Sequence, residues 1–346
     1  MIKIDQYTFK TTLFFTLLCL LLLVIIETFF TFLNELQDLG TSDYSLIHVA
    51  SYILFDTPTR VYRIFPMALL LGALLGLGQL ASNSELTAIR TAGFSKLRTI
   101  YGAIFATIFL SAIVALIGEF MIPITEQRAQ EMSRKTTKGQ GFWAIDGHYI
   151  VEVGSTLNGD LRNITLYDAH DQLLNQVTTA SKAEIDHDSW HFPDAASTTF
   201  SEEKISKTPK KATEIPIVID NQALTALTST PESLSAQKLW EFIRYLDRNG
   251  LDSSEHRLAF WSKIFHPLTN ISMILIAAPL VFAQQRQKGI GERILIGVVL
   301  GLCIYLATQM LGHFILIAGF APIIGALIPT LLAITIAFVL FRLVPN

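Results

Sequence analysis

Residues with the types and spacing that enzyme chemistry needs are rare in this chain. The sequence contains no Gly-Lys dipeptide, which excludes the phosphate-binding loop of P-loop ATPases, and no His-Glu-x-x-His zinc motif. The histidines of the polar middle segment lack metal-ligand spacing: His148, His170, His187 and His191. We therefore expect neither a catalytic residue nor a metal site, and the remaining ionisable residues become candidates for binding and coupling.

The most informative acid lies in the polar loop ASNSELTAIRTAGFSKLR (81–98). Ser82 or Ser84 can cap a short helix here, and Gly93 can end it. Glu85 then falls in the first turn, where the helix dipole favours an anion.

Such a helix combines an exposed acid, Glu85, with the apolar Leu86 and Ile89. This combination suits docking into a groove of a partner protein. An ordinary connecting helix explains the pattern equally well, so the residues alone leave both interpretations open.

Basic residues form a second group near the ends of the apolar segments. A ring of them can bind anionic lipid headgroups. Lysine and arginine at a membrane rim also extend their charges to water without any ligand, and this alternative stays open. The members are Arg60, Arg63, Arg128, Arg134, Lys135, Lys138, Arg257 and Lys263.

Ionisable or polar residues inside the apolar segments form a third group: Glu27, Glu119, Gln309 and His313. Such residues are functional candidates by default, and a proton relay would need them to meet in a cavity. Structural hydrogen bonds explain single glutamates near an interface as well.

The elements that position these residues are long apolar segments. The chain of 346 residues is 51% hydrophobic and 16% charged, well below the roughly 25% charged residues of soluble proteins. Each apolar segment is long enough to cross a bilayer as a helix. The composition excludes a cytosolic enzyme, a disordered chain and a disulfide scaffold. The segments are 11–33, 64–81, 99–122, 264–283, 294–317 and 321–341.

The distribution of basic residues predicts the orientation of the six segments. With the N-terminus inside, the short inner segments hold nine lysines and arginines and the short outer ones hold two. The positive-inside rule then places both termini in the cytoplasm and the polar insertion, 124–258, outside it.

The insertion has strand signals. HYIVEV (148–153), ITLYDA (164–169) and IPIVID (215–220) are short β-branched or aromatic runs separated by turn sequences. We expect an antiparallel sandwich or jelly roll, a loop over 200–211, and a helix over 233–250 that Ser233 or Ser235 caps and Gly250 ends.

Small residues at helical spacing predict close helix contacts in the membrane. Gly72 and Gly76, and likewise Gly297 and Gly301, fall on one helix face. The sequence does not tell whether these contacts are internal or with another chain.

The sequence resembles the lipopolysaccharide-export permeases of the LptF/LptG type, and their LptG branch in particular, over nearly the whole chain. The matching stretches, in family order, are FPMALLLGALLGLGQLASNSELTAIRTAGFS (65–95), IGEFMIP (117–123), GFWAIDGHYIVEV (141–153), LRNITLYD (161–168), LWEFIRYLDRNGLDSSEHRLAFWSKIFHPL (239–268) and IPTLLAI (328–334).

The resemblance implies an α-helical polytopic membrane protein with an inserted periplasmic β-jelly-roll domain. Its parts are 1–123, with transmembrane helices 1–3 and a coupling helix at about 82–95; 124–258, with the jelly roll and a connecting helix; and 259–346, with helices 4–6. The multi-pass protein would lie in the inner membrane of a Gram-negative bacterium.

The implied function is that of the permease subunit of an ATP-driven transporter. It extracts lipopolysaccharide from the outer leaflet of the inner membrane and passes it to a periplasmic bridge towards the outer membrane. The implied partners are a second six-span subunit (LptF type), a cytoplasmic ATPase dimer (LptB type) and bridge proteins (LptC and LptA type). The ATPase binds ATP and Mg, and this chain binds no cofactor and no nucleic acid.

The resemblance also assigns roles to residues of this chain. Those for coupling to the ATPase are Glu85, Leu86, Ile89, Arg90 and Gly93. Those for binding lipopolysaccharide are Arg60, Arg63, Arg128, Arg134, Lys135 and Lys263.

The chain departs from the family pattern at the outer end of its first apolar segment. Some members carry lysines there, whereas this chain has Thr31, Asn34, Glu35, Gln37 and Asp38. Either other rim residues supply the charge, or substrate contact is mainly apolar. Candidates for acyl-chain contact are Phe29, Phe30 and Phe32, which ordinary lipid-facing aromatics explain as well.

Two other functions compete with this one. An ion-coupled lipid transporter acting alone would need Glu27, Glu119 or His313 to titrate in a cavity. A structural membrane anchor would present the β-domain to partners without any coupling through Glu85.

Overall fold

The computed structural model describes residues 3–37, 45–132, 141–157, 160–170, 173–186, 189–201, 204–215, 230–283 and 290–343. The chain divides into two compact units. The helix bundle contains Met1–Asn34, Asp56–Ile124 and Ser254–Asn346, and the β-unit contains Glu35–Phe55 and Thr125–Ser253.

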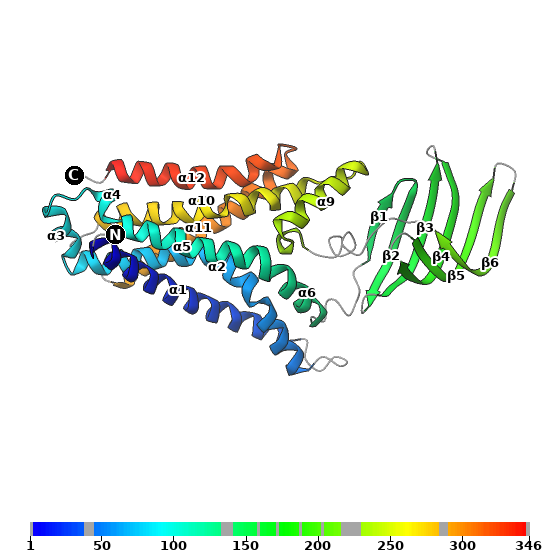
Figure 1. Ribbon diagram of the computed structural model, residues 1–346, viewed down its shortest axis with the longest axis horizontal. Coiled ribbons are helices and arrows are strands. Elements are labelled where there is room, and N and C mark those ends of the chain that lie inside the picture. Colours follow the sequence, from blue (N-terminus) through cyan, green and yellow to red (C-terminus); the bar gives the residue numbers. More distant parts are fainter. Residues whose placement is uncertain are drawn as a thin grey trace. The chain divides into compact units, whose positions relative to one another are not determined.

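Within the described ranges, 6 helices are long and apolar enough to cross a membrane, which confirms the predicted number. Helix is the favoured form of these segments because it pairs every backbone group within the segment. The start of α1 and the end of α12 lie at the same end of the bundle (Figure 1), as an even number of crossings requires. The first two helices are α1 (Lys3–Leu36) and α2 (Leu46–Ser82). The third is continuous through α5 (Tyr101–Leu116), the π-helical turn η1 (Ile117–Met121) and α6 (Ile122–Met132). The last three are α10 (Ser254–Ala283), α11 (Ile290–Ile317) and α12 (Pro322–Leu343).

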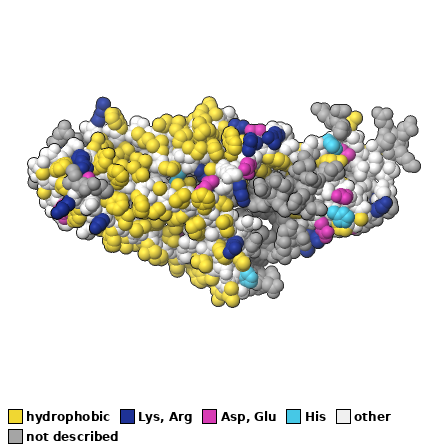
Figure 2. All heavy atoms as spheres, in the orientation of Figure 1, with side chains coloured by type: hydrophobic (Ala, Val, Ile, Leu, Met, Phe, Trp, Pro, Cys, Tyr) yellow, Lys and Arg dark blue, Asp and Glu magenta, His cyan; other side chains and the backbone are white. Residues whose placement is uncertain are grey.

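Helix α1 buries small or polar residues and exposes apolar ones. Its buried stripe, about one residue per turn, consists of Asp5, Thr8, Thr12, Thr16 and Cys19. Its leucine, isoleucine and phenylalanine side chains are largely exposed, and hydrophobic side chains cover the middle of the bundle in Figure 2. A bilayer explains this arrangement, because lipid solvates apolar side chains and small residues let helix backbones approach closely.

The glycine pairs contact helices of the same chain. This confirms the predicted close packing and shows that the contacts are within one chain rather than with another. A Cβ on Gly72 would lie 2.4 Å from Thr16 Cα of α1. A Cβ on Gly297 would lie 2.6 Å from Leu71 Cδ2, so α11 packs on α2 as well. Helix α2 therefore lies between α1 and α11.

Substitution of Gly72 by alanine is expected to push α1 away from α2 and to destabilise the bundle by about 1–3 kcal/mol, the usual cost of overpacking. Gly76→Ala is the matched control, because the added Cβ would meet its nearest neighbour, Thr11 O, at 3.4 Å. Thermal unfolding of the full chain in detergent measures both. Equal stability of the two variants would contradict the close contact at Gly72.

The described residues of the β-unit form one 6-stranded antiparallel sheet whose strands follow each other in sequence order. Two predicted strands, 148–153 and 164–169, are confirmed, and most of 215–220 lies outside the described residues. The jelly-roll closure of the sheet stays a prediction, whereas the inserted antiparallel β-domain is confirmed. The strands are β1 (Phe142–Asp146), β2 (Tyr149–Leu157), β3 (Asp160–His170), β4 (Leu173–Asp186), β5 (Ser189–Ser201) and β6 (Lys204–Ile215).

The predicted loop over 200–211 is wrong, because most of it belongs to β6. This strand pairs with β5 in the registers Phe200↔Ile205 and His191↔Glu214. Its lysines and Pro209 gave it the polar composition of a loop. These residue types are also typical of a strand at the edge of a sheet, where one side of the backbone needs no partner strand.

One face of the sheet carries its apolar core. Val151 and Val153 of β2, Leu166 of β3, and Trp190 and Phe192 of β5 are almost completely buried. They alternate with less buried residues because successive side chains of a strand point to opposite faces.

Helix α9 (Ala236–Arg248) lies within the predicted range 233–250, with Ser235 rather than Ser233 as its cap, and follows a single 3-10 turn, η2 (Pro231–Ser233). Ser235 Oγ accepts a hydrogen bond from Lys238 N–H at 3.2 Å, and Gly250 follows the helix with φ of 66°. The Tyr245 hydroxyl donates to Ile145 O of β1 at 2.8 Å, so this helix is attached to the sheet within the β-unit.

Candidate functional site

The loop between α2 and α5 folds into two short helices, α3 (Glu85–Thr91) and α4 (Lys96–Thr99). Gly93, with φ of 91°, ends α3 as predicted, and its N–H donates to Arg90 O at 2.9 Å. Figure 1 shows α3 at the end of the bundle where α1 begins. The loop therefore presents a short helix next to the first turns of α1.

The predicted serine cap of α3 is wrong. Ser84 precedes the helix in the left-handed conformation, with φ of 63°, and its side chain makes no capping bond. Ser82 Oγ donates back to Gln79 O at 2.9 Å within the last turn of α2. Asn83 Nδ2 instead donates to Glu85 Oε1 at 3.1 Å and orients the acid.

Leu86 is completely buried in the apolar core of the bundle and anchors α3 there, while its predicted role in coupling stays a prediction. Ile89 is half-buried against the same core. Glu85 and Arg90 are half-exposed and Gly93 is exposed. The helix is thus fixed to the bundle on one side and offers an acid and a base on the other.

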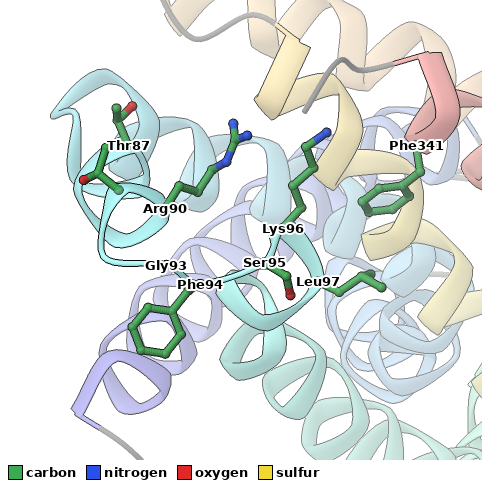
Figure 3. Close-up of a pocket in the computed structure, with 9 residues that line it drawn as sticks. Thr87, Arg90, Gly93, Phe94, Ser95, Lys96, Leu97 and Phe341 are labelled. Carbon is green, nitrogen blue, oxygen red and sulfur yellow. The ribbon is translucent and has the colours of Figure 1, made fainter.

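A pocket of about 670 Å³ opens beside α3 (Figure 3). Burial and the charge of Arg90 lower the pKa of Lys96. The lining of the pocket combines two basic side chains, Arg90 and Lys96, with aromatic and aliphatic ones. This combination suits a partner segment that carries both acidic and apolar residues. Its lining residues are Thr87, Arg90, Thr91, Gly93, Phe94, Ser95, Lys96, Leu97 and Phe341.

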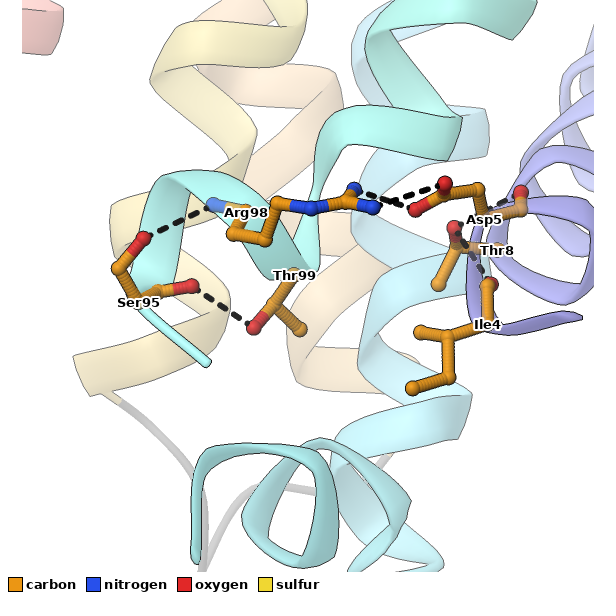
Figure 4. A network of polar contacts seen from close by, with 6 residues as sticks. All are labelled: Ile4, Asp5, Thr8, Ser95, Arg98 and Thr99. Atoms are coloured by element: carbon orange, nitrogen blue, oxygen red, sulfur yellow. Dashed lines mark hydrogen bonds and ion pairs between the residues drawn. The ribbon is translucent and has the colours of Figure 1, made fainter. Parts of the chain in front are cut away.

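An ion pair ties this loop to α1 (Figure 4). Arg98 Nη1 and Nη2 donate to the two carboxylate oxygens of Asp5 at 2.5 and 3.0 Å. This hydrogen bonding raises the pKa of Arg98. A Cβ on Gly102 would lie 2.1 Å from Asp5 O, so the start of α1 lies directly against α5. The Asp5–Arg98 pair is therefore held at a close helix contact.

A second contact joins the same elements. The Tyr7 hydroxyl of α1 forms a side-chain hydrogen bond with the Glu85 carboxylate. Sequence reasoning missed both Asp5 and Tyr7. The available signal was a charged residue in the first turn of a helix that otherwise faces lipid, since such a charge needs a partner.

The predicted lipid-binding arginines on α2 are already paired. Arg60 is 1% exposed, and its Nε donates to Asp56 Oδ2 at 2.5 Å, while its contact with substrate stays a prediction. Arg63 is exposed and forms an ion pair with Glu27 of α1. The sequence did not identify Asp56, which lies one turn before Arg60.

The other predicted lipid-binding cations have separate surroundings. Arg128 is exposed, with its guanidinium 5.8 Å from the centre of the Phe55 ring. Lys263 Nζ donates at 3.3 Å to Gly118 O, which belongs to the π-helical turn η1. Arg134 and Lys135 lie outside the described residues.

The three candidate acyl-chain contacts lie on the exposed surface of α1. Phe29, Phe30 and Phe32 are 56%, 60% and 37% exposed. They are available to hydrocarbon, whether from membrane lipid or from a substrate.

The intramembrane ionisable residues have individual environments. Glu27 pairs with Arg63, Glu119 lies in η1, and His313 is exposed on α11, while the side chain of Gln309 lies outside the described part of the chain. Among the residues that the structure describes, no three His, Cys, Asp or Glu side chains are grouped to hold a metal ion.

Comparison with known proteins gives matches over almost the whole chain. A family model described as "Lipopolysaccharide export system permease LptF/LptG" matches residues 6–343. The lipopolysaccharide export system permease protein LptG of Escherichia coli (strain K12) is 31% identical over 342 residues, covering 94% of each chain. The protein of the same name from Haemophilus influenzae is 31% identical over 343 residues, covering 96% of each.

Proposed function

Because the chain belongs to the LptF/LptG family of lipopolysaccharide export permeases, we propose that it is the permease subunit of an ATP-driven lipopolysaccharide transporter. It extracts lipopolysaccharide from the outer leaflet of the inner membrane and passes it to a periplasmic bridge towards the outer membrane. Both termini face the cytoplasm, and the sheet lies in the periplasm.

The observation that carries this proposal is the attachment of the α3–α4 loop to α1. Leu86 fixes α3 to the bundle core, while Asp5 and Arg98 connect the loop to the first turn of α1. A displacement of α3 by a bound ATPase therefore acts on α1 directly, without passing through the rest of the bundle.

ATP hydrolysis belongs to a separate dimer of the LptB type, which binds ATP and Mg. The coupling residues that remain accessible for it are Glu85, Arg90 and Gly93, with Ile89 at the edge of the core. The free energy of ATP moves lipid only if the ATPase and the lipid each prefer one conformation of the permease over the other. Further partners are an LptF-type subunit and bridge proteins of the LptC and LptA type.

The substrate path combines exposed aromatic residues with cations. Phe29, Phe30 and Phe32 contact acyl chains, and Arg63 and Arg128 are the exposed cations for phosphate. The β-domain forms part of the periplasmic route.

Co-purification tests this function. The chain, expressed with the LptF-type and LptB-type proteins of the same organism and extracted in mild detergent, should be recovered as one complex. In proteoliposomes the complex should release lipopolysaccharide to a bridge protein only with ATP. Lipid movement driven by a proton gradient without the ATPase would establish the ion-coupled transporter instead. Recovery of the chain alone, with lipid release unaffected by ATP, would favour the structural anchor.

A further inference from the structure

The pocket beside α3 extends beyond the residues assigned to coupling. Its volume of about 670 Å³ lies within the range of roughly 300–1,000 Å³ that is usual for small-ligand sites. Its walls come from α3, from α4 with the turn before it, and from the last turn of α12 (Figure 3). A molecule bound here would therefore contact the loop and a membrane-spanning helix at the same time.

Two basic side chains lie on the same side of this pocket. Arg90 of α3 and Lys96 of α4 extend in the same direction in Figure 3. Burial and the charge of Arg90 lower the pKa of Lys96, so the two cations are near enough to repel each other. Among the residues that the structure describes, no carboxylate forms an ion pair with Arg90. An anion bound beside both cations would offset their repulsion.

Hydroxyl groups add hydrogen-bond donors to the same pocket. Ser95 Oγ accepts a hydrogen bond from Arg98 N–H at 3.3 Å, which leaves the hydroxyl proton of Ser95 to donate to a ligand. Thr87 lines the pocket as well and is exposed on α3. Hydroxyl donors beside a lysine and an arginine are the groups that bind the oxygens of a phosphate.

The apolar part of the lining lies at the depth of the membrane surface. Phe341 belongs to the last turn of α12, whose span of 21 residues is about 30 Å long at a rise of about 1.5 Å per residue, the thickness of the hydrocarbon core. Leu97 is 56% exposed and lies shortly before Tyr101, where the third span begins. A lipid can therefore reach the pocket from the edge of the bilayer.

We propose that Arg90, Ser95 and Lys96 bind the phosphate of an anionic phospholipid of the cytoplasmic leaflet, with its glycerol and first acyl carbons against Leu97 and Phe341. Basic pockets between membrane helices on the cytoplasmic side bind such headgroups. This inference rests on the proposed function for its orientation. It adds a lipid of the surrounding membrane, distinct from the transported one, that connects the α3–α4 loop to α12.

Lys96→Gln tests the site, because Lys96 lines the pocket and has no assigned role in coupling. The full chain in detergent is titrated with phosphatidylglycerol, and native mass spectrometry measures the bound lipid. The variant should bind about fivefold more weakly, the contribution of one basic residue at an anionic membrane surface. Lys3→Gln removes the same charge from an exposed residue at the start of α1 and should leave binding unchanged. Equal weakening by both variants would show a general attraction to cations and overturn the site.

Three other probes identify the ligand. Phosphatidylcholine, whose headgroup has no net charge, should bind the wild type and Lys96→Gln equally. Leu97→Ser should weaken binding of phosphatidylglycerol but not of glycerol phosphate, because only the lipid contacts the apolar wall. Inorganic phosphate that bound as tightly as phosphatidylglycerol would identify a site for the free ion. Loss of ATPase association in Lys96→Gln without any change in lipid binding would identify a protein contact, and either of these two results overturns the proposal.

Thermal unfolding shows whether the variants fold. Phosphatidylglycerol should raise the unfolding temperature of the wild type more than that of Lys96→Gln, because a ligand stabilises the state that binds it. Lys96→Arg keeps the charge and should bind this lipid like the wild type.

The outcomes for this site and for the proposed function can be distinguished. Unchanged phosphatidylglycerol binding by Lys96→Gln, in a complex that releases lipopolysaccharide with ATP, would overturn the site and leave the proposed function intact. Binding of phosphatidylglycerol that depends on Lys96, in a chain that forms no complex with the ATPase, would support the site and refute the proposed function.

Discussion

Glu85→Lys is expected to abolish stable association with the ATPase and the lipid release that depends on it. Arg90 and Lys96 already line the neighbouring pocket, so the substitution makes the accessible surface of the loop uniformly positive. It also removes the acceptor of the Asn83 hydrogen bond, which orients the acid within the loop, and of the Tyr7 hydrogen bond, which joins the loop to α1. Co-purification with the ATPase, together with ATP-dependent lipid release, measures the effect.

Two matched variants test whether the loss of association comes from the charge of the new side chain or from its position on the loop. Glu85→Gln keeps the size and hydrogen bonding of the side chain and should retain partial association. Glu241→Lys makes the same charge change on α9, in the β-unit, and should leave association unchanged. Wild-type recovery of the complex with Glu85→Lys would show that this acid has no part in coupling.

Trp190→Ala is expected to destabilise the β-unit by about 3–5 kcal/mol, the usual cost of removing a buried tryptophan side chain. Trp190 is completely buried, its ring lies 6.3 Å from that of Phe192, and its backbone pairs with Ile215 of β6. The cavity would open between the two strands at one edge of the sheet. Limited proteolysis of the full chain, with cleavage sites mapped to 189–215, measures the loss.

Trp143→Ala is the control for this prediction, since Trp143 is 56% exposed and stacks on Tyr167 at the sheet surface. It should change protease resistance little. Trp190→Phe should retain most of the stability, because it fills much of the space and removes an indole N–H that is buried without a partner among the described residues. Equal protease sensitivity of Trp143→Ala and Trp190→Ala would contradict the assigned core.

The strands show which parts of the sheet can be predicted from residue types alone and which cannot. Runs rich in valine, isoleucine and tyrosine identified the positions of β2 and β3, because those residue types fill a half-buried sheet. The same criterion rejected β6, whose lysines suit an edge position. Only pairing with the adjacent strand β5 makes that segment a strand, and its own residue types do not show this pairing.

Some features of the candidate site likewise follow from neighbouring residues in the sequence, and others depend on how the helices pack. Its location on the loop after α2, the half-exposed acid Glu85 and the end of α3 at Gly93 follow from residues adjacent in sequence. The burial of Leu86 depends on the apolar core formed by other helices, so the pattern of an amphipathic helix could not show which apolar residue remained accessible.

The sequence by itself determined the six membrane helices, the inserted β-domain and the position of α9, because hydropathy and capping act within a few consecutive turns. Only the tertiary structure decided which charges meet. Asp5 pairs with Arg98, 93 residues away, and Glu27 pairs with Arg63, 36 residues away. A charge in a helix reveals that it needs a partner, but the partner is set by how the helices pack, and that depends on close contacts such as those at Gly72 and Gly102.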